Sequence, residues 1–244
     1  MSPQLHHDMV EALTWLNTDT ESKVLVLTGA GESFCAGMDL KEFFRELDDK
    51  PVERAAARDA DRRWGWYGLT RFSKPTIAMV NGYCFGGAFT PLVACDFAIA
   101  ADDATFGLSE VNWGIIPGGL VSKVVTEVMT HRKAMYYAAT GRPFDGKEAE
   151  AIGLVTKSVP ADKLKEEVTA LANELMDKSP AVLRAIREAI RAVTHMSIDE
   201  AYEYLEAKQE QMRFRDAENT RNRGIEEFIE KKTYRPGFEP VGKG

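Results

Sequence analysis

Apolar residues recur every three or four positions at the start of the chain. Between Leu5 and Leu16 this spacing predicts an amphipathic helix over about residues 3–18. Residues 24–28 then form a nearly continuous apolar run that ends at a glycine. A run of this kind is typical of a strand buried on both faces, as in a parallel sheet. The chain is therefore predicted to begin with a helix that is followed by a buried strand.

Strand and helix patterns alternate to about residue 159, and only helical patterns follow. Strands are expected over residues 76–80, 96–100, 104–108 and 154–159. Helices are expected over residues 41–47, 49–73, 89–95, 120–125, 131–140 and 146–152, and then over 162–177, 180–193, 198–215 and 221–231. Such alternation favours a parallel sheet covered by helices. We predict an α/β protein with a core over residues 1–160 and a helical C-terminal region over residues 161–244.

One stretch, from Val80 to Pro91, combines a strand end with a glycine pair and a helix start. Glycine can take positive φ and lets another group approach the backbone closely. The first N–H groups of a helix lack intrahelical partners and lie at the positive end of its dipole. Gly86 and Gly87 could therefore hold an anion, or a negative charge that develops during a reaction. The alternative for a glycine pair by itself is a purely structural βα turn.

Three further features could complete such a site. The loop around Met38 follows an apolar strand, as the glycine pair does, and offers backbone N–H groups. Glu110 has apolar neighbours such as Trp113, and a carboxyl group in apolar surroundings has a raised pKa suited to a general acid or base. Thr90 places a hydroxyl at the start of the helix after the glycines. The structural alternatives are simple packing for Met38, a surface ion pair for Glu110 and a helix cap for Thr90.

Composition and charge argue against several other classes of function. The net charge of −7 disfavours bulk nucleic-acid binding, and no apolar run reaches the ~18 residues of a membrane helix. The three cysteines lack metal-ligand spacing, and the sequence holds no nucleophile elbow, phosphate-binding loop or zinc-protease motif. His6, His7, His131 and His195 are expected to be exposed or satisfied, so no metal site is predicted. Reduced thiols and the lack of a signal-peptide pattern indicate a cytoplasmic protein.

An ordered series of short motifs resembles the crotonase superfamily, also called the enoyl-CoA hydratase/isomerase family. The matching elements are Ala36-Gly37-Met38-Asp39-Leu40, Lys74-Pro75, Val80-Asn81-Gly82-Tyr83-Cys84-Phe85-Gly86-Gly87, Cys95-Asp96, Ala104-Thr105-Phe106-Gly107, Gly114-Ile115-Ile116-Pro117-Gly118 and Thr140-Gly141. They occur in the family's order over about residues 20–160. The resemblance implies a spiral of ββα turns and a helical C-terminal region that covers the active site. It also implies assembly as a homotrimer or homohexamer.

The resemblance implies an acyl-CoA thioester substrate, with coenzyme A as part of the substrate and no separate cofactor. It implies no nucleic-acid or membrane partner. The family's shared chemistry is the stabilisation of a thioester enolate by two backbone N–H groups. Matched residue by residue, those oxyanion-hole donors are Met38 and Gly87. Neighbouring residues that are expected to contact the substrate are Ala36, Asp39, Leu40, Gly86 and Trp113.

Within this family, the runs over residues 26–34, 37–42, 91–96 and 107–115 look like those of the hydroxycinnamoyl-CoA hydratase-lyases. These enzymes add water to a hydroxycinnamoyl-CoA such as feruloyl-CoA, and then cleave the product to acetyl-CoA and an aromatic aldehyde such as vanillin. Enoyl-CoA hydratases carry two glutamates, of which one matches Glu110 and the other falls at Thr90, so simple hydration is disfavoured. The resemblance implies Glu110 as the acid–base residue and Thr90 as a ligand of the attacking water.

Three features depart from the hydratase-lyase pattern. Tyrosines that contact the substrate phenol in those enzymes are replaced here by Phe43 and by Glu206. Phe43, Glu206 and Tyr204, which belongs to the same C-terminal helical motif as Glu206, are expected to contact the substrate. Glu206 could still accept a hydrogen bond from a phenol, or the substrate could be non-phenolic. The chain also begins at Met1, inside a segment that two further strands precede in the family. We therefore expect the family's first strands to be missing.

Two other functions stay open on the sequence. One is a different crotonase-type reaction, such as hydration or hydrolysis of a CoA thioester. The other is a CoA-binding or assembly subunit without turnover. Retention of both loops and of Glu110 favours an enzyme, whereas the expected loss of the first strands favours the non-catalytic subunit.

Overall fold

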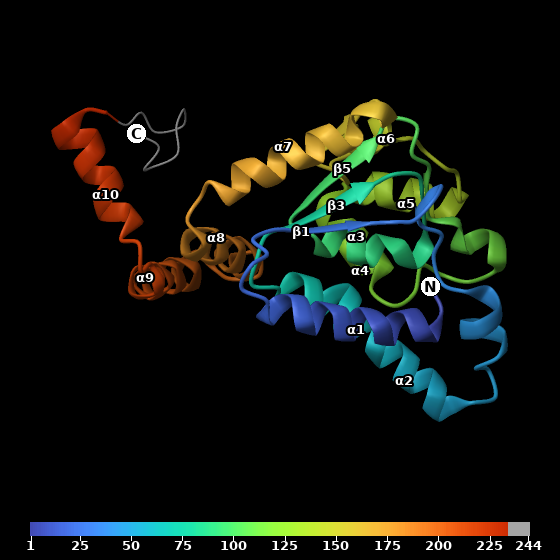
Figure 1. Cartoon of the computed structure of the whole chain (residues 1–244). Helices are drawn as coiled ribbons and strands as arrows, with labels where there is room; N and C mark the ends of the chain where they lie inside the picture. The colour runs from blue at the N-terminus through green and yellow to red at the C-terminus, as the bar shows by residue number, and fades with distance from the viewer. Residues whose placement is uncertain (234–244) are drawn as a thin grey trace. The chain divides into compact units, whose positions relative to one another are not determined.

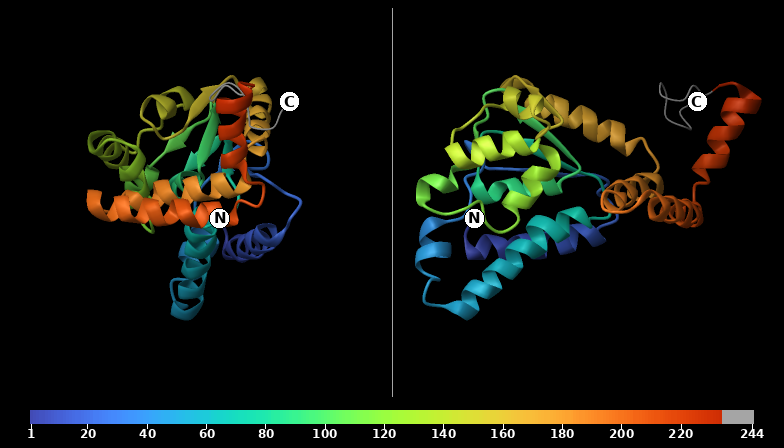
Figure 2. Two further views of the ribbon diagram at one scale, coloured as in Figure 1. Left: turned by 90° about the vertical axis from the view of Figure 1, so that its left-hand side faces the viewer. Right: turned by 180° about the vertical axis from the view of Figure 1, so that it is seen from behind.

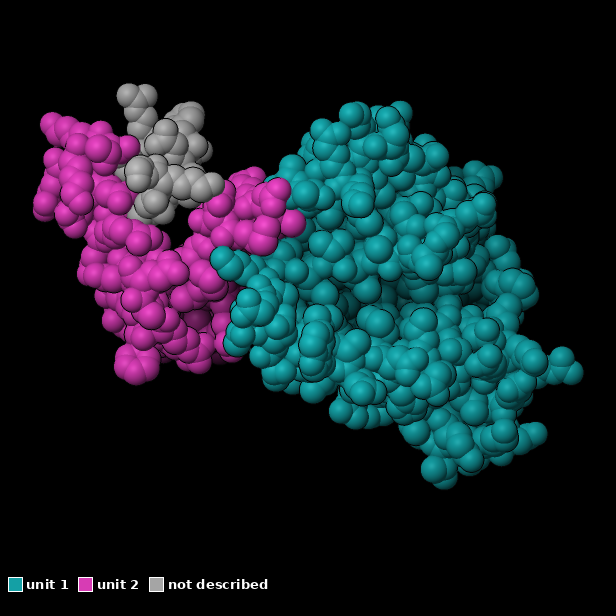
Figure 3. All heavy atoms as spheres, in the orientation of Figure 1, with its two compact units in different colours: residues 1–72, 76–170 teal, residues 73–75, 171–244 magenta. Residues whose placement is uncertain are grey.

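The computed structural model describes residues 1–233, and the chain separates into two compact units. One unit comprises residues 1–72 and 76–170, and the other comprises residues 73–75 and 171–244 (Figure 3). All of the strands described below lie in the first unit. The expected functional division after residue 160 stays a prediction.

The first unit is built on a four-stranded parallel sheet with the order β1-β3-β5-β7 (Figure 1). Its strands are β1 (Leu25–Thr28), β3 (Thr76–Val80), β5 (Phe97–Ala101) and β7 (Lys157–Val159). The inner strands β3 and β5 are almost wholly buried, as their continuous apolar runs predict. The expectation of burial on both faces is wrong for β1, because this strand lies at the sheet edge and alternates half-buried and exposed residues.

A second parallel sheet has the order β2-β4-β6. Each of its strands follows one strand of the first sheet along the chain. Its strands are β2 (Ser33–Cys35), β4 (Tyr83–Phe85) and β6 (Phe106–Gly107). Only β6 is predicted by the sequence, because β2 and β4 are too short to show a hydrophobic period. Each pair of strands is followed by helical turns, so the expected spiral of ββα units is present.

Glycine is required where β3 passes into β4. A methyl group on Gly82 would lie 2.0 Å from the carbonyl oxygen of Glu32, which is closer than any side chain allows. Asn81 links the same two turns, since its side-chain amide nitrogen donates to the carbonyl oxygens of Gly29 and Gly31 at 3.1 and 2.9 Å. The two glycine-rich turns are therefore held side by side by backbone contact.

Helices surround both sheets of the first unit (Figure 2). The α-helices are α1 (Pro3–Thr18), α2 (Pro51–Arg62), α3 (Phe89–Ala94), α4 (Val121–Val128), α5 (His131–Thr140), α6 (Gly146–Ala151) and α7 (Leu164–Met176), whose last residues belong to the second unit. The shorter turns are the π-helical η1 (Leu40–Arg45) and η2 (Arg63–Gly68) and the 3₁₀-helical η3 (Gly86–Ala88), η4 (Ser109–Trp113) and η5 (Ala161–Lys163). The predicted helix over residues 49–73 is thus present, but it changes from α to π geometry after Arg62.

The second unit is helical, as the sequence predicts. It contains α8 (Pro180–Val193), α9 (Ile198–Arg215), α10 (Thr220–Glu226) and the π-helical η6 (Glu227–Lys231). A capping box between Ser197 and Glu200 starts α9. The ammonium group of Lys208 on α9 donates to Glu188 on α8 at 2.7 Å and links the two helices. No helix in residues 1–233 is long and apolar enough to cross a membrane.

Candidate active site

The loops that follow β2 and β4 meet at one place, because these strands are parallel neighbours in which Cys35 pairs with Cys84. A methyl group on Gly37 would lie 2.9 Å from the carbonyl oxygen of Phe85 and 3.8 Å from the nitrogen of Gly87. A methyl group on Gly87 would lie 3.3 Å from Cγ of Met38. The two loops predicted from sequence to act together are therefore in contact.

Two backbone N–H groups are available in these loops. Among residues 1–233, neither the N–H of Met38 nor that of Gly87 donates a hydrogen bond to the protein. Gly37 and Gly86 precede these donors and have φ values of +91° and +52°, a left-handed region that favours glycine. The positive φ values turn the backbone at both loops, which leaves two donors close together for an anionic oxygen.

Glu110 lies at the same place, in the 3₁₀ turn η4 that follows β6. Its Oε1 is only 3.1 Å from the position that a methyl group on Gly86 would occupy, so the carboxyl group rests against the glycine pair. Its Oε2 is buried and has no hydrogen-bond partner within the described residues. Burial raises the pKa of Glu110, and a backbone hydrogen bond partly opposes this shift. The carboxyl group can therefore exchange a proton with a bound molecule at a pH closer to neutrality than usual.

Packing of β6 fixes the segment that leads to Glu110. Phe106 is fully buried, stacks on Phe144 with ring centroids 5.5 Å apart, and meets Phe89 of α3 edge-on at 6.4 Å. Antiparallel backbone hydrogen bonds between Phe106 and Phe144 hold the same strand from its other side. The segment that carries Glu110 thus follows a strand that is fixed by aromatic packing and by backbone hydrogen bonds.

Two other predicted residues are buried beside these loops. Thr90 is buried on α3, two residues after the turn that carries Gly87. Phe43 in η1 is also buried and packs with Leu47 and Ala57 in a small cluster against which Met38 lies. Phe43 therefore supports the Met38 loop, and its direct contact with substrate stays a prediction.

The remaining predicted contacts lie at the surface of the first unit or on the second. Asp39 caps η1, where its Oδ1 accepts from the N–H groups of Lys41 and Glu42 at 2.9 and 2.6 Å. Ala36, Leu40 and Trp113 are exposed. On α9 of the second unit, Glu206 is exposed and the ring of Tyr204 lies 5.4 Å from the ammonium group of Lys208. Substrate contact by these residues stays a prediction.

A buried polar cluster behind Phe43 is not predicted by the sequence. His6 is fully buried, its Nδ1 accepts a hydrogen bond from Nε1 of Trp64 at 2.8 Å, and its ring meets Phe43 edge-on at 6.0 Å. Its Nε2 has no partner within residues 1–233, so the expectation of an exposed or satisfied histidine is only half correct. Burial is the main reason that the pKa of His6 falls to about 4.

Asp61 on α2 completes this polar cluster. Its Oδ1 lies 3.6 Å from Nδ1 of His6, and burial raises the pKa of Asp61 to about 6. The sequence gives little signal for it, because Asp61 stands among arginines and aspartates that read as a solvated helix face. In residues 1–233 no group of three or more His, Cys, Asp or Glu side chains is arranged to hold a metal ion.

Three ββα units, two available N–H donors at adjoining loops and one half-buried carboxyl group define a crotonase-like fold and site. The family model for enoyl-CoA hydratase/isomerase matches residues 1–238. The chain belongs to this family.

Relatives within the family differ in their activities. The chain is 48% identical over 241 residues to a hydroxycinnamoyl-CoA hydratase-lyase of Pseudomonas fluorescens, covering 98% of this chain and 87% of the relative. It is 34% identical over 234 residues to a probable enoyl-CoA hydratase of Mycobacterium tuberculosis, covering 95% and 87%. It is 35% identical over 207 residues to a carnitinyl-CoA dehydratase of Escherichia coli K12, covering 81% and 74%.

Solved structures support the same fold. An enoyl-CoA hydratase from Bacillus anthracis superimposes with a TM-score of 0.83 at 29% identity, covering 96% of this chain and 89% of that one. An enoyl-CoA hydratase from Mycobacterium smegmatis has a TM-score of 0.84 at 24% identity, covering 95% and 87%, a level of identity that supports the fold alone.

Proposed function

We propose that the protein is a CoA-thioester hydratase-lyase that converts a hydroxycinnamoyl-CoA such as feruloyl-CoA to acetyl-CoA and an aromatic aldehyde of the vanillin type. The observation that carries this proposal is the 48% identity, over 98% of the chain, to a hydroxycinnamoyl-CoA hydratase-lyase. The position of Glu110 against Gly86 supports the chemistry, since a half-buried carboxyl group with an unpartnered oxygen lies at the glycine pair.

In the hydration step, Glu110 removes a proton from water as the water oxygen attacks the β-carbon. The electron pair of the Cα–Cβ double bond moves to the thioester oxygen, and the resulting enolate is held by the N–H groups of Met38 and Gly87. Glu110 then returns a proton to the α-carbon. A carboxyl group with a raised pKa suits both halves of this step, because it must accept and release a proton at one pH.

In the lyase step, Glu110 removes the proton of the new β-hydroxyl group. The Cα–Cβ bond breaks, the aldehyde C=O forms, and the electron pair passes to the thioester oxygen of an acetyl-CoA enolate. The same two N–H groups hold this second enolate until its carbon is protonated. Thr90 is proposed to bind the water and later the β-hydroxyl oxygen.

Incubation of the full chain with feruloyl-CoA tests this function. We expect the absorbance of the conjugated thioester to fall while vanillin and acetyl-CoA appear in equal amounts. Accumulation of the β-hydroxy thioester alone would show a hydratase, which the relationship to a probable enoyl-CoA hydratase favours as the second candidate. Binding of CoA without turnover would show a non-catalytic subunit.

Glu206 is proposed to set the preference for the aromatic substituent. Changing Glu206→Tyr is expected to lower KM for 4-hydroxylated substrates about fivefold, since one hydrogen bond contributes about 1 kcal/mol. Glu203→Tyr on the same helix is the matched control and should leave KM unchanged. An unchanged KM in the Glu206 variant would show that residue 206 does not face the ring.

The same family relationship supports a cytoplasmic homotrimer or homohexamer as the proposed assembly. Light scattering on the purified full chain measures its mass directly. A monomer at micromolar concentration would contradict this part of the proposal.

A further inference from the structure

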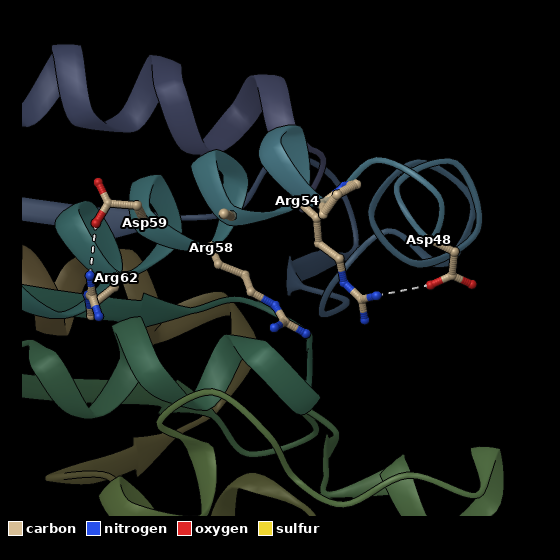
Figure 4. Close-up of a pocket in the computed structure, with 7 residues that line it drawn as sticks. Asp48, Arg54, Arg58, Asp59 and Arg62 are labelled. Atoms are coloured by element: carbon tan, nitrogen blue, oxygen red, sulfur yellow. Dashed lines mark hydrogen bonds and ion pairs between the residues drawn. The ribbon is translucent and has the colours of Figure 1, made fainter.

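A hollow of about 520 Å³ lies along one side of α2, outside the candidate active site (Figure 4). Arg54, Arg58 and Arg62 line it at intervals of four residues, which places their side chains on one stripe of the helix. The rest of the lining consists of Asp48, which lies between η1 and α2, and of three residues of α2, namely Pro51, Ala55 and Asp59. Three arginines thus line, in a row along the helix, a space large enough for a small organic molecule.

The outer two arginines are partly neutralised, and the middle one is not. Arg54 pairs with Asp48 at 3.2 Å and Arg62 pairs with Asp59 at 2.9 Å. Arg58 has no acidic partner among residues 1–233, and its side chain extends into the space between these two pairs (Figure 4). The hollow therefore carries one uncompensated positive charge on a protein whose net charge is −7.

Arg54 lies beside this space with part of its guanidinium group already engaged. One nitrogen donates to Asp48 at 3.2 Å, and Nε is buried without a hydrogen-bond partner within the described residues. Because Nε is shielded from solvent, an anion in the hollow would meet the outer nitrogens of Arg54, and it would compensate the charge of Arg58.

We propose that this hollow is a binding site for a phosphate monoester. The guanidinium group presents a planar fork of donors that matches phosphate oxygens, and a dianion can accept from two arginines together. The small apolar side chains of Pro51 and Ala55 line the same hollow and leave room for the organic part of the ester. The site is separate from the thioester chemistry proposed above and does not depend on it.

Helix α2 connects this anion site to the loop of Met38. The opposite stripe of α2 buries Ala57 in the cluster with Phe43 and Leu47, and Met38 packs against that cluster. A phosphate group that bridges Arg54 and Arg58 fixes α2 along the turn between these two residues. The ligand would therefore stabilise the helix that supports one side of the candidate active site.

The test is a calorimetric titration of the full chain with inorganic phosphate at constant ionic strength, without CoA. We expect one saturable site per chain, at least a tenfold loss of affinity in Arg58→Ala, and a smaller loss in Arg58→Lys, which keeps the charge but not the fork. Arg132→Ala, an exposed arginine on α5, is the matched control and should bind as the wild type does. Equal losses in both alanine variants would overturn the proposal, because they would show a general charge effect.

Two further arms identify the source of the anion. Acetate at the same concentrations should bind at least tenfold more weakly than phosphate, and equal binding lost in Arg58→Ala would instead show a carboxylate site. CoA tests whether the hollow serves the substrate's own phosphates. If Arg58→Ala weakens CoA binding while inorganic phosphate fails to bind the wild type, the separate site is disproved. Unchanged circular dichroism of both alanine variants confirms that they fold.

Discussion

Glu110 and Asp61 are two partly buried carboxyl groups whose pKa values burial raises, yet their surroundings differ. Glu110 rests against Gly86, and its Oε2 has no partner within residues 1–233. Asp61 instead lies 3.6 Å from His6, which is itself tied to Trp64. Burial therefore raises the pKa both of a carboxyl group at a glycine-lined site and of one in a packed polar cluster.

The difference shows that a raised pKa by itself does not mark a catalytic group. What distinguishes Glu110 is the absence of side chains on the glycines that face it, together with two available N–H donors nearby. Asp61 faces the buried imidazole of His6, whose ring meets Phe43 edge-on. On this comparison we expect Glu110 to control turnover and Asp61 to control the pH dependence of stability.

Replacement of the carboxyl group in Glu110→Gln should have the largest effect. Turnover of feruloyl-CoA is expected to fall ~10²–10⁴-fold, because a positioned general acid–base group typically contributes this much. Thioester binding and the free energy of unfolding should change little, since the amide has nearly the same shape. Steady-state kinetics and a binding titration with a non-reactive CoA thioester measure the two effects. Full activity of the variant would disprove the acid–base role.

The change Gly86→Ala tests whether Glu110 needs a residue without a side chain at position 86. Its methyl group would lie 3.1 Å from Oε1 of Glu110 on a backbone with φ of +52°, so the carboxyl group must shift by a few tenths of an ångström. We expect turnover to fall about tenfold, since small displacements of reacting groups are costly, and stability to fall by about 1 kcal/mol.

Gly31→Ala is the matched control for this strain. Gly31 has φ of +70° with nothing within 4 Å of its added methyl group. It should therefore lose a similar amount of stability in urea denaturation and keep its turnover. Equal loss of turnover in both variants would show that contact between residue 86 and Glu110 is unimportant.

The smallest effect on turnover, and a gain in stability, is expected for Asp61→Asn. The pKa of Asp61 is about 6 in the folded chain, against an ordinary aspartate value of 3.8. The folded state therefore binds this proton more tightly than the unfolded state, and stability is lost as the pH rises from about 4 to about 6. Removing the charge should raise the free energy of unfolding at pH 8 by up to about 3 kcal/mol.

Urea denaturation at several pH values between 4 and 8 measures this gain and its pH dependence. Asp103→Asn, on an exposed loop, is the surface control and should leave the profile unchanged. A variant of Asp61 that keeps the wild-type pH dependence would contradict the assignment of that dependence to Asp61.

The sequence predicts the elements that continuous apolar runs encode. The strands β3 and β5 and the helices α1, α5, α8 and α9 lie close to their predicted bounds, since long periodic segments carry a strong signal. The strands β2 and β4 are not predicted by the sequence, because three residues are too few to show a hydrophobic period. The strand β1 is partly exposed because it lies at the sheet edge. Its place in the sheet depends on pairing with a distant strand, which the local sequence pattern does not show.

The candidate site is partly predictable for a related reason. Glycine pairs and a carboxylate among apolar residues identify Gly87, Met38 and Glu110, and the structure places their segments together. His6 and Asp61 escape notice because each looks like an ordinary surface residue in its own segment. Only the packing of α1 against α2 brings these two side chains together.

Turnover of feruloyl-CoA in deuterium oxide tests the central claim most directly. Hydration adds one solvent proton to the α-carbon, and protonation of the enolate after bond cleavage adds a second. We therefore predict acetyl-CoA that carries two deuterium atoms in its methyl group, formed by the wild type and at least ~10²-fold more slowly by Glu110→Gln. A β-hydroxy thioester with one deuterium as the final product, or labelled acetyl-CoA formed equally fast by the variant, would contradict the account.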